Sequence, residues 1–320
     1  MRKAALLFNP NSGGRRRRQS AEVETALSIL RTAGVDAVLT PTQSSAEATE
    51  CARAAIANGY DTILACGGDG TIHDVLQAMV GSPVALGILP TGTANALAHD
   101  LGVPLNPVAA ARAALIAKPR QIALGRMQYR DFSGGQSSRF FIVAAGIGVD
   151  AHLFYELEAG LKRHMGMTAY YAKATHLWLT HRMHRFHVEW VQTGGGEVQQ
   201  ATVSELLAVR IRNFGGVLQE LAPGASLERD DMRLVLFRTT NRLLYLLYVI
   251  RGLLRRRFRV RDIELVHSEK VVCDCLPPSQ GGNLEAGAGA RIYVEADGEL
   301  VGTIPAEITV VPNAITVLAP

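Results

Sequence analysis

The sequence lacks a hydrophobic run long enough to cross a membrane as a helix. Its most apolar later segment, Leu243–Leu254, is interrupted by Arg251 and falls short of the ~20 residues that a spanning helix needs. The apolar stretch Ala4–Phe8 near the N-terminus is too short for a signal peptide. We therefore expect a soluble protein of the cytoplasm, with peripheral association with a membrane surface as a further option.

Cysteine is scarce, and its spacing does not match the common zinc modules. None of the four cysteines belongs to a C-x-x-C pair, and Cys273 and Cys275 are too close in sequence for an ordinary disulfide. Cys66 lies in an apolar run that is typical of a buried strand. We expect reduced thiols, as in a cytoplasmic protein.

Nucleic-acid motifs are also missing, although the chain is basic. The net charge is +4 and the pI about 9.0, yet the sequence has no zinc-finger spacing and no basic motif interleaved with aromatic residues. The positive charge is clustered at Arg15–Arg18 and between Arg251 and Arg261. Such patches favour phosphates or acidic lipid headgroups as partners, and we expect no nucleic acid.

The first part of the chain alternates apolar runs with helical patterns. A length of 320 residues fits two domains of ordinary size. Strand patterns at Lys3–Phe8, Asp36–Thr40 and Val84–Leu89, with a further one from Thr62, are separated by helical segments. The alternation predicts a doubly wound parallel sheet with helices on both faces. We place this α/β domain at residues 1–125, and the C-terminal tail could return to it.

Small-residue turns follow three of these strands, at Asn9–Gly13, Gly67–Thr71 and Pro90–Asn95. Glycine lets the backbone approach an anion closely, and a helix start adds free N–H groups. The carboxyl ends of parallel strands meet at one edge of a sheet, so the turns can converge on one ligand. In the second turn, Asp69 would lie beside a bound phosphoryl group, where it could serve a metal or accept a proton. The alternative for Asp69 is a simple helix cap.

From about residue 126 the pattern changes to strands, which predicts a mainly antiparallel, β-sandwich-like domain over 126–320. Ser138–Ala145 and Thr202–Arg212 are two of the predicted strands, and helices are predicted over Ala151–His184 and Asn241–Arg257. We expect the active-site cleft between the two domains. Within the last helix, the apolar residues are interpreted first as core and second as an interfacial membrane helix.

Several segments resemble the diacylglycerol kinase catalytic-domain family, which includes bacterial lipid kinases, sphingosine kinases and ceramide kinases. The segments stand in family order over nearly the whole chain: Asn9–Gly13, Gly67–Thr71, Pro90–Ala98, Gly146–Ala151, Asn213–Gly216, Ala222–Ala225, Asp231–Leu234 and Asp297–Glu299. The resemblance implies transfer of the γ-phosphate of ATP, with Mg²⁺, to a hydroxyl of a lipid such as diacylglycerol or a sphingoid base. It assigns nucleotide binding to the α/β domain and the lipid substrate to the β-rich domain.

The resemblance also assigns roles to single residues. Glu299 would be the general base with Asp297 beside it, and Asp69 would organise the metal or share the base role. The nucleotide would be held by Asn9, Pro10, Asn11, Ser12, Gly13, Thr42, Gly67, Gly68, Asp69, Gly70, Thr71, Thr93 and Asn95. A structural Mg²⁺ would bind the side chain of Asp231 and the backbone carbonyls of Glu228 and Arg233.

The sequence departs from the family pattern at three positions. Ala96 and Ala123 stand where many bacterial diacylglycerol kinases have aspartate, and Met232 replaces a glycine. Both lost carboxylates would lie near the structural Mg²⁺. Two alternatives therefore stay open: an enzyme like NAD kinase, and a non-catalytic lipid-binding or regulatory protein with a decayed site. The lipid substrate and the oligomeric state, including a homodimer, are not fixed by the sequence.

Overall fold

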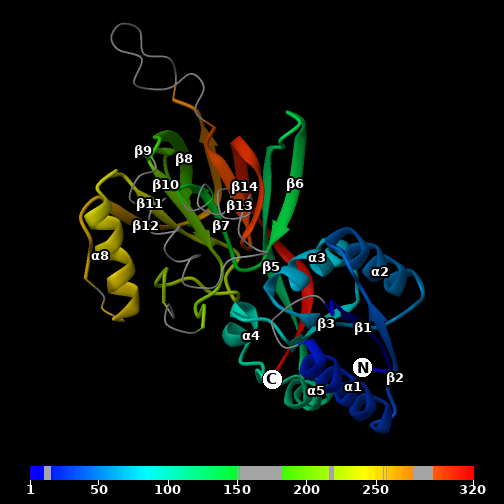
Figure 1. Ribbon diagram of the computed structural model, residues 1–320. Coiled ribbons are helices and arrows are strands. Elements are labelled where there is room, and N and C mark those ends of the chain that lie inside the picture. Colours follow the sequence, from blue (N-terminus) through cyan, green and yellow to red (C-terminus); the bar gives the residue numbers. More distant parts are fainter. Residues whose placement is uncertain are drawn as a thin grey trace, which may run out of the picture. The chain divides into compact units, whose positions relative to one another are not determined.

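The computed structural model describes residues 1–10, 16–149, 151, 182–215, 220–254, 256, 258–276 and 291–320 (Figure 1). The chain forms two compact units. Unit 1 comprises Met1–Leu124, Ile211–Leu221 and Val311–Pro320, and unit 2 comprises Gly125–Arg210 and Ala222–Val310. None of the helices in these described ranges is both long and apolar enough to cross a membrane.

Unit 1 is built on a parallel sheet with the strand order β2-β1-β3-β4-β14. Its elements are β1 (Lys3–Phe8), α1 (Arg16–Thr32), β2 (Asp36–Pro41), α2 (Ser45–Ala57), β3 (Thr62–Gly67), α3 (Asp69–Met79), β4 (Ala85–Pro90), α4 (Ala96–Leu101), α5 (Pro107–Ile116), the start of β5 (Lys118–Arg130) and the end of β14 (Glu299–Ala319). All six residues of β3 and of β4 are buried, as uninterrupted apolar runs predict for central parallel strands. Helices α2 and α3 cover one face of the sheet, and α1 and α5 cover the other (Figure 1).

The strand register brings the ends of the central strands to one edge of this sheet. Phe8 pairs with Pro41 and with Cys66, and Gly67 pairs with Pro90. The predicted parallel α/β architecture is therefore confirmed.

A distant segment completes unit 1. The carboxylate of Asp100, in α4, accepts hydrogen bonds from the backbone N–H groups of Arg212 and Asn213, each at 2.8 Å. These bonds attach residues 211–221 to unit 1, although the chain on both sides of the segment belongs to unit 2.

Unit 2 is mainly antiparallel, as predicted. Its elements are most of β5, β6 (Gln136–Phe141), β7 (Ala144–Gly148), β8 (Phe186–Gln192), β9 (Gln199–Val203), β10 (Glu205–Val209), β11 (Met232–Phe237), α8 (Arg242–Leu253), β12 (Ile263–Asp274), β13 (Tyr293–Ala296) and the first part of β14. The pairings β14-β13-β7-β10-β11-β12 return to β14 and so close a ring of strands. Side chains such as Phe141, Phe186, Leu234 and Val294 fill its core.

Two predicted strands are each interrupted. The segment predicted as Ser138–Ala145 forms β6 and β7, and the segment predicted as Thr202–Arg212 forms β9 and β10. The helix predicted over Ala151–His184 falls almost wholly outside the described residues.

Candidate active site

The turns after β3 and β4 in unit 1 touch each other through glycines. A Cβ added at Gly92 would lie 2.5 Å from the Cα of Gly68, and one added at Gly68 would lie 3.1 Å from the Cα of Gly92. The N–H of Thr91 donates to the carbonyl of Gly67 at 3.0 Å. The two predicted turns therefore form one continuous backbone surface, and only glycine permits this approach. Residues 11–13 of the first predicted turn lie outside the described residues.

Asp69 caps a helix other than its own. It is the first residue of α3, and its carboxylate accepts hydrogen bonds from the N–H groups of Ala96 at 3.1 Å and Leu97 at 3.2 Å, the first two residues of α4. A carboxylate is stabilised there by the free amides and the dipole of the short helix. The alternative of a simple cap on its own helix is therefore wrong: the N-cap of α3 is Gly68, and Asp69 instead caps α4, which begins 27 residues later.

Asn95 holds the turn after β4 in shape. Its backbone is left-handed (φ 49°), its side-chain Oδ1 accepts from the N–H of Gly92 at 3.0 Å, and its Nδ2 donates to the carbonyl of Gly92 at 2.9 Å. The Asn95 side chain is buried in these contacts. Thr93, beside it, is exposed at the tip of the turn. Asn95 therefore shapes the loop, while Thr93 is accessible to a ligand.

Other predicted nucleotide residues of unit 1 lie at the same edge of the sheet. Asn9 and Pro10 follow β1 and are half-buried, and Gly70 and Thr71 form the first turn of α3. Thr42 follows β2, and its buried hydroxyl has no hydrogen-bond partner among the described residues. A buried hydroxyl at the end of a parallel strand is well suited to bind a polar ligand atom.

A polar hollow of about 370 Å³ opens beside the turn after β4. Arg18 and Gln19 of α1, Thr91 and Gly92 of the turn, and Asn106 before α5 contribute to its wall. The side-chain amide of Gln19 donates to the carbonyl of Thr91 at 2.7 Å. Gln19 Oε1 and the Thr91 hydroxyl are buried and have no partner in the part of the chain that the structure describes. Neither Gln19 nor a site role for Gly92 is among the residues predicted from the sequence. An apolar strand followed by a small-residue turn marks Gly92, whereas no local pattern marks Gln19.

In unit 2, Asp297 is held by a cluster of backbone amides. Its carboxylate accepts from the N–H groups of Ile142 at 3.0 Å, Val143 at 2.8 Å and Ala144 at 3.1 Å. Asp297 and Gly298 form the two-residue hairpin between β13 and β14, with φ values of 50° and 83°. Both positive φ values belong to a type I′ turn, for which Asp-Gly is a preferred sequence. Asp297 therefore fixes the position of the hairpin.

Glu299 is the residue that the hairpin presents. It is the first residue of β14, pairs across the hairpin with Ala296, and is exposed. The neighbouring Glu295 is buried instead, and its carboxylate accepts from the N–H of Gly298 at 2.7 Å. Of the two predicted catalytic carboxylates in unit 2, Glu299 faces solvent and Asp297 is engaged by the backbone.

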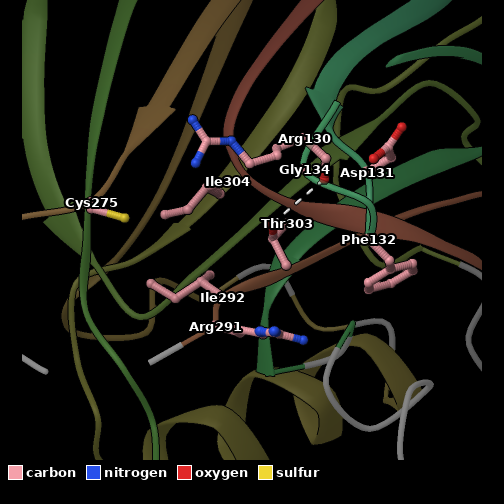
Figure 2. Close-up of a pocket in the computed structure, with 9 residues that line it drawn as sticks. All are labelled: Arg130, Asp131, Phe132, Gly134, Cys275, Arg291, Ile292, Thr303 and Ile304. Atoms are coloured by element: carbon pink, nitrogen blue, oxygen red, sulfur yellow. Dashed lines mark hydrogen bonds between the residues drawn. The ribbon is translucent and has the colours of Figure 1, made fainter. Parts of the chain in front are cut away.

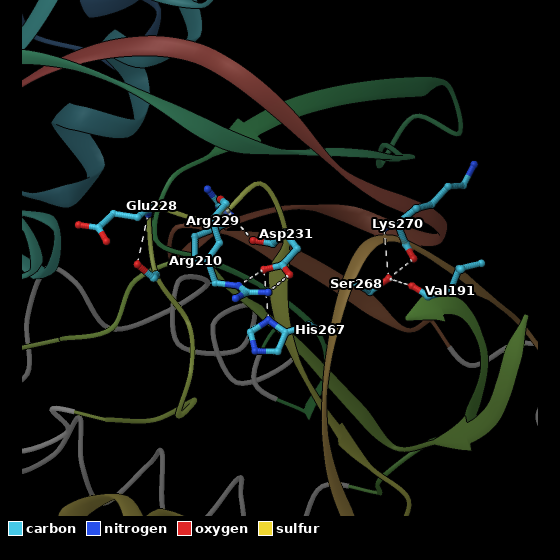
Figure 3. Close-up of polar contacts among 9 residues, drawn as sticks. Val191, Arg210, Glu228, Arg229, Asp231, His267, Ser268 and Lys270 are labelled. Carbon is cyan, nitrogen blue, oxygen red and sulfur yellow. Dashed lines mark hydrogen bonds and ion pairs between the residues drawn. The ribbon is translucent and has the colours of Figure 1, made fainter. Parts of the chain in front are cut away.

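Asp231 lies in a group of cationic side chains (Figure 3). Its buried carboxylate pairs with Arg229 through Nε at 2.7 Å and Nη2 at 2.5 Å, and with Nδ1 of His267 at 3.2 Å. Although burial alone would raise the pKa of Asp231, the hydrogen bonds from Arg229 hold it below its ordinary value. Burial lowers the pKa of His267.

The buried side chain of Arg210 also belongs to this group, which it contacts through backbone carbonyls. Its guanidinium donates to the carbonyl of Arg229 at 2.9 Å and to the carbonyl of Asp231. Burial lowers the pKa of Arg210 to about 10. Arg210 was not among the predicted site residues, although an arginine directly after the apolar strand β10 is a sequence signal for such a buried partner.

The Asp231 carboxylate, a predicted Mg²⁺ ligand, is already bound by the guanidinium group of Arg229. A Mg²⁺ site needs carboxylate and carbonyl oxygens that are free to coordinate, so a cation here would have to displace this guanidinium group. Coordination by the backbone carbonyls of Glu228 and Arg233 stays a prediction. Glu228 lies close by, where its N–H donates to the Ser226 hydroxyl, and Arg233 lies in β11. Within the described ranges, no three His, Cys, Asp or Glu side chains gather in a way that could hold a metal ion.

A second hollow, of about 300 Å³, lies between the β5–β6 turn and the strands β13 and β14 (Figure 2). Its wall combines charged side chains such as Arg130 and Arg291 with apolar ones such as Ile292 and Ile304. The predicted site residues are not among those that line it, so this hollow is not assigned to the substrate.

Comparison with known proteins supports the same family as the motifs. Residues 3–127 match the family model described as diacylglycerol kinase catalytic domain. The chain is 25% identical over 323 residues to a diacylglycerol kinase of Bacillus subtilis (strain 168), covering 100% of this chain and 97% of the relative. It is 27% identical over 325 residues to a diacylglycerol kinase of Mycobacterium tuberculosis (strain H37Rv), covering 99% and 95%.

A solved structure shows the same fold. A diacylglycerol kinase from Bacillus anthracis superposes with a TM-score of 0.69 at 18% identity, over 99% of this chain and 97% of that chain. The predicted resemblance and the predicted fold class are confirmed. With the catalytic-domain match, the prediction that the chain is an enzyme of the lipid-kinase class is confirmed as well.

Proposed function

We propose that this diacylglycerol-kinase-like chain transfers the γ-phosphate of ATP to a hydroxyl group of a membrane lipid, with diacylglycerol as the first candidate. The observation that carries the proposal is the paired turn of unit 1, in which Gly68 and Gly92 meet at the carboxyl edge of a parallel sheet. Backbone amides at such an edge bind phosphate groups without a lysine. Unit 1 is accordingly assigned to the nucleotide and unit 2 to the lipid.

In unit 1, Asp69 has a positioning role in the proposal. By binding the first amides of α4, it holds the turn that contains Thr93 against the glycines after β3. The exposed Thr93 and the buried Thr42 hydroxyl are assigned to the nucleotide. Mg²⁺ bound with ATP would neutralise the charge of the phosphates, which is the main electrostatic requirement of phosphoryl transfer.

In unit 2, Glu299 is the proposed general base. Phosphoryl transfer needs one group that accepts the proton of the attacking hydroxyl. Glu299 is exposed and stands on a hairpin that Asp297 anchors with three backbone hydrogen bonds. Asp297 keeps the base in place and does not itself take the proton.

The test is phosphate transfer from γ-labelled ATP with Mg²⁺ to a panel of acceptors. The panel contains diacylglycerol, monoacylglycerol, sphingosine, ceramide and NAD. Labelled phosphatidic acid as the main product would support the proposal. Labelled NADP alone would favour an enzyme like NAD kinase. Tight binding of ATP or lipid with no labelled product from any acceptor would favour a regulatory protein and overturn the kinase proposal.

A further inference from the structure

Helix α8 presents its aliphatic side chains to solvent. Seven large aliphatic residues of this segment are exposed: Leu243, Leu246, Leu247, Val249, Ile250, Leu253 and Leu254. At about 100° per residue they cover about 160° of the helix circumference. Leu243 is 72% exposed and Leu254 62%, values far from those of core residues. The interpretation of these residues as core is therefore wrong, and α8 lies at the outside of unit 2 (Figure 1).

The opposite face of α8 is buried by aromatic and polar contacts. Tyr245 stacks on Phe237 with ring centroids 4.3 Å apart, and its hydroxyl is 2.7 Å from the Ser204 hydroxyl. Tyr248 packs edge-on against Phe237, and the buried Arg251 lies 4.2 Å above the Tyr248 ring. These contacts determine which face of the helix is turned inward. The helix therefore turns its aliphatic face to solvent and its aromatic and polar face to unit 2, the reverse of an ordinary surface helix.

The part of the chain that contains α8 is rich in arginine. Residues 238–264 contain eight arginines and two acidic residues, a net +6, whereas the whole chain carries +4. Among the described residues of this stretch, Arg238 pairs with Glu264 at 2.5 Å and Arg261 with Asp262 at 3.6 Å. Arg256 and Arg259, directly after the helix, are exposed. An aliphatic face and an adjoining excess of arginine therefore occur together.

We propose that α8 docks the protein on a lipid bilayer that contains anionic headgroups, the helix lying in the interface with its aliphatic face toward the acyl chains. Helices that bind in this way combine an apolar face with basic residues. The 12 residues of α8 span about 18 Å, too short to cross a bilayer but sufficient to lie in its surface. The proposal rests on the proposed function in that it places the enzyme on the surface that contains its lipid substrate.

The charge selects a bilayer over a second copy of the chain. In a two-fold dimer through α8, the same patch would be present on both subunits, so the net positive charge of one copy would be brought up to that of the other. Like charges brought together in this way oppose association, whereas anionic headgroups neutralise them.

The experiment is flotation of the full chain with vesicles of phosphatidylcholine containing about 30 mol% phosphatidylglycerol, and with pure phosphatidylcholine vesicles. The wild-type protein should bind the anionic vesicles, and binding should weaken when NaCl is raised from about 0.1 M to about 0.5 M. Leu246→Gln with Ile250→Gln, and separately Arg256→Gln with Arg259→Gln, should each reduce binding at least about tenfold. Ile116→Gln, an 84% exposed aliphatic residue of α5, is the matched control and should bind like wild type.

Two further measurements separate this proposal from its rivals and from the proposed function. Leu247→Trp should be quenched by brominated lipid, and Ile116→Trp should not. The Leu246/Ile250 variant should keep its activity on a water-soluble short-chain lipid and lose it on lipid embedded in vesicles. If the kinase activity itself is absent, flotation and quenching still test α8.

Two outcomes would overturn the docking proposal. One is vesicle binding that the Leu246/Ile250 variant retains. The other is a wild-type dimer in sedimentation velocity that this variant dissociates, without vesicle binding, because the aliphatic face would then be an interface between copies. An unchanged circular dichroism spectrum and melting temperature of the variant establish that it is folded.

Discussion

Asp69 binds the first two backbone amides of α4 and Asp297 binds those of residues 142–144, while Glu299 is exposed on the hairpin that Asp297 anchors. A carboxylate that accepts several amide hydrogen bonds is a stabilising group, since these bonds are stronger than those between neutral partners. A general base must instead be able to reach the hydroxyl from which it takes a proton. At the residue scale, this contrast separates two positioning aspartates from one proposed catalytic glutamate.

Replacing Glu299 by Gln should lower kcat by ~10²–10⁴-fold, the usual contribution of a general base, and leave the KM for ATP nearly unchanged. Because Glu299 is exposed, the free energy of unfolding should stay within about 0.5 kcal/mol of wild type. Steady-state kinetics and urea unfolding check both statements. If Glu299→Gln kept near-full activity while Asp69→Asn lost turnover with ATP binding intact, Asp69 would be the base.

Replacing Asp297 by Ala should act mainly on stability. The three N–H groups of residues 142–144 would lose their charged acceptor, and alanine is disfavoured at a φ of 50°. We expect a loss of about 2 kcal/mol in the free energy of unfolding, measured by urea denaturation. Glu299→Gln, two residues away, is the control. Equal stability of Asp297→Ala and wild type would show that the amides do not need this carboxylate.

At the element scale, the contact between the turns after β3 and β4 is the feature on which the nucleotide site depends. Gly92→Ala places a Cβ 2.5 Å from the Cα of Gly68, so the two turns must separate. We expect the KM for ATP to rise at least about tenfold, because backbone amides misplaced by about 1 Å lose their alignment with phosphate. Kinetics with ATP as the varied substrate make the measurement.

Gly59→Ala is the control for Gly92→Ala. Gly59 also needs a positive φ (71°), but no atom lies within 4 Å of its added Cβ. This variant should lose about 1 kcal/mol of stability and keep the wild-type KM for ATP. If both variants raised the KM equally, the effect would be one of stability and the contact between the turns would be irrelevant to ATP.

At the scale of the whole molecule, the ion pair of Asp231 predicts a pH dependence of stability. The pKa of Asp231 is lower in the folded chain than its ordinary value of about 3.9, so its contribution is present above about pH 4 and is lost as the pH falls through the folded value. The stability gap between wild type and Asp231→Asn should narrow below about pH 4, as the carboxylate takes a proton in the folded chain. Urea unfolding at several pH values checks it, with the more exposed Asp262→Asn as a control that gives a much smaller gap. A gap that widens as the pH falls below about 4 would contradict the assignment.

The same cluster predicts that stability does not depend on a structural metal ion. Arg229 and Arg210 already bind the oxygens of Asp231 and of the neighbouring backbone. In the absence of nucleotide, adding Mg²⁺ or a chelator should therefore leave the melting temperature of the chain unchanged within about 1 °C. A rise with Mg²⁺ that Asp231→Asn abolishes would show that a cation displaces the guanidinium group.

Local features of the sequence were sufficient for much of the fold and for part of the site. The parallel strands of unit 1 follow from uninterrupted apolar runs, and the turns at Gly67–Thr71 and Pro90–Asn95 follow from clustered small residues. Strand periodicity and turn chemistry act over a few residues, so they can be recognised without knowing the tertiary structure. The family resemblance, carried by the same short segments, could be recognised for the same reason.

Where the structure of a segment depends on a partner far away in sequence, the local sequence pattern did not predict it. The predicted strand Ser138–Ala145 breaks because the N–H groups at 142–144 donate to Asp297, more than 150 residues later. The sequence around Asp231 resembles the metal-site region of the family, yet in the structure the Asp231 carboxylate pairs with Arg229 and His267.

The order of the elements in unit 1, the glycine turns at the ends of its strands, and the presence of an apolar helix followed by arginines can all be predicted from local sequence. Only the tertiary structure decided that Asp69 caps α4 and that the aliphatic face of α8 points outward. The physical reason is the range of the interactions. Backbone conformation and hydrophobic period are set by neighbours in sequence, whereas Tyr245 and Arg251 choose the buried face of α8 through partners that only folding brings within reach.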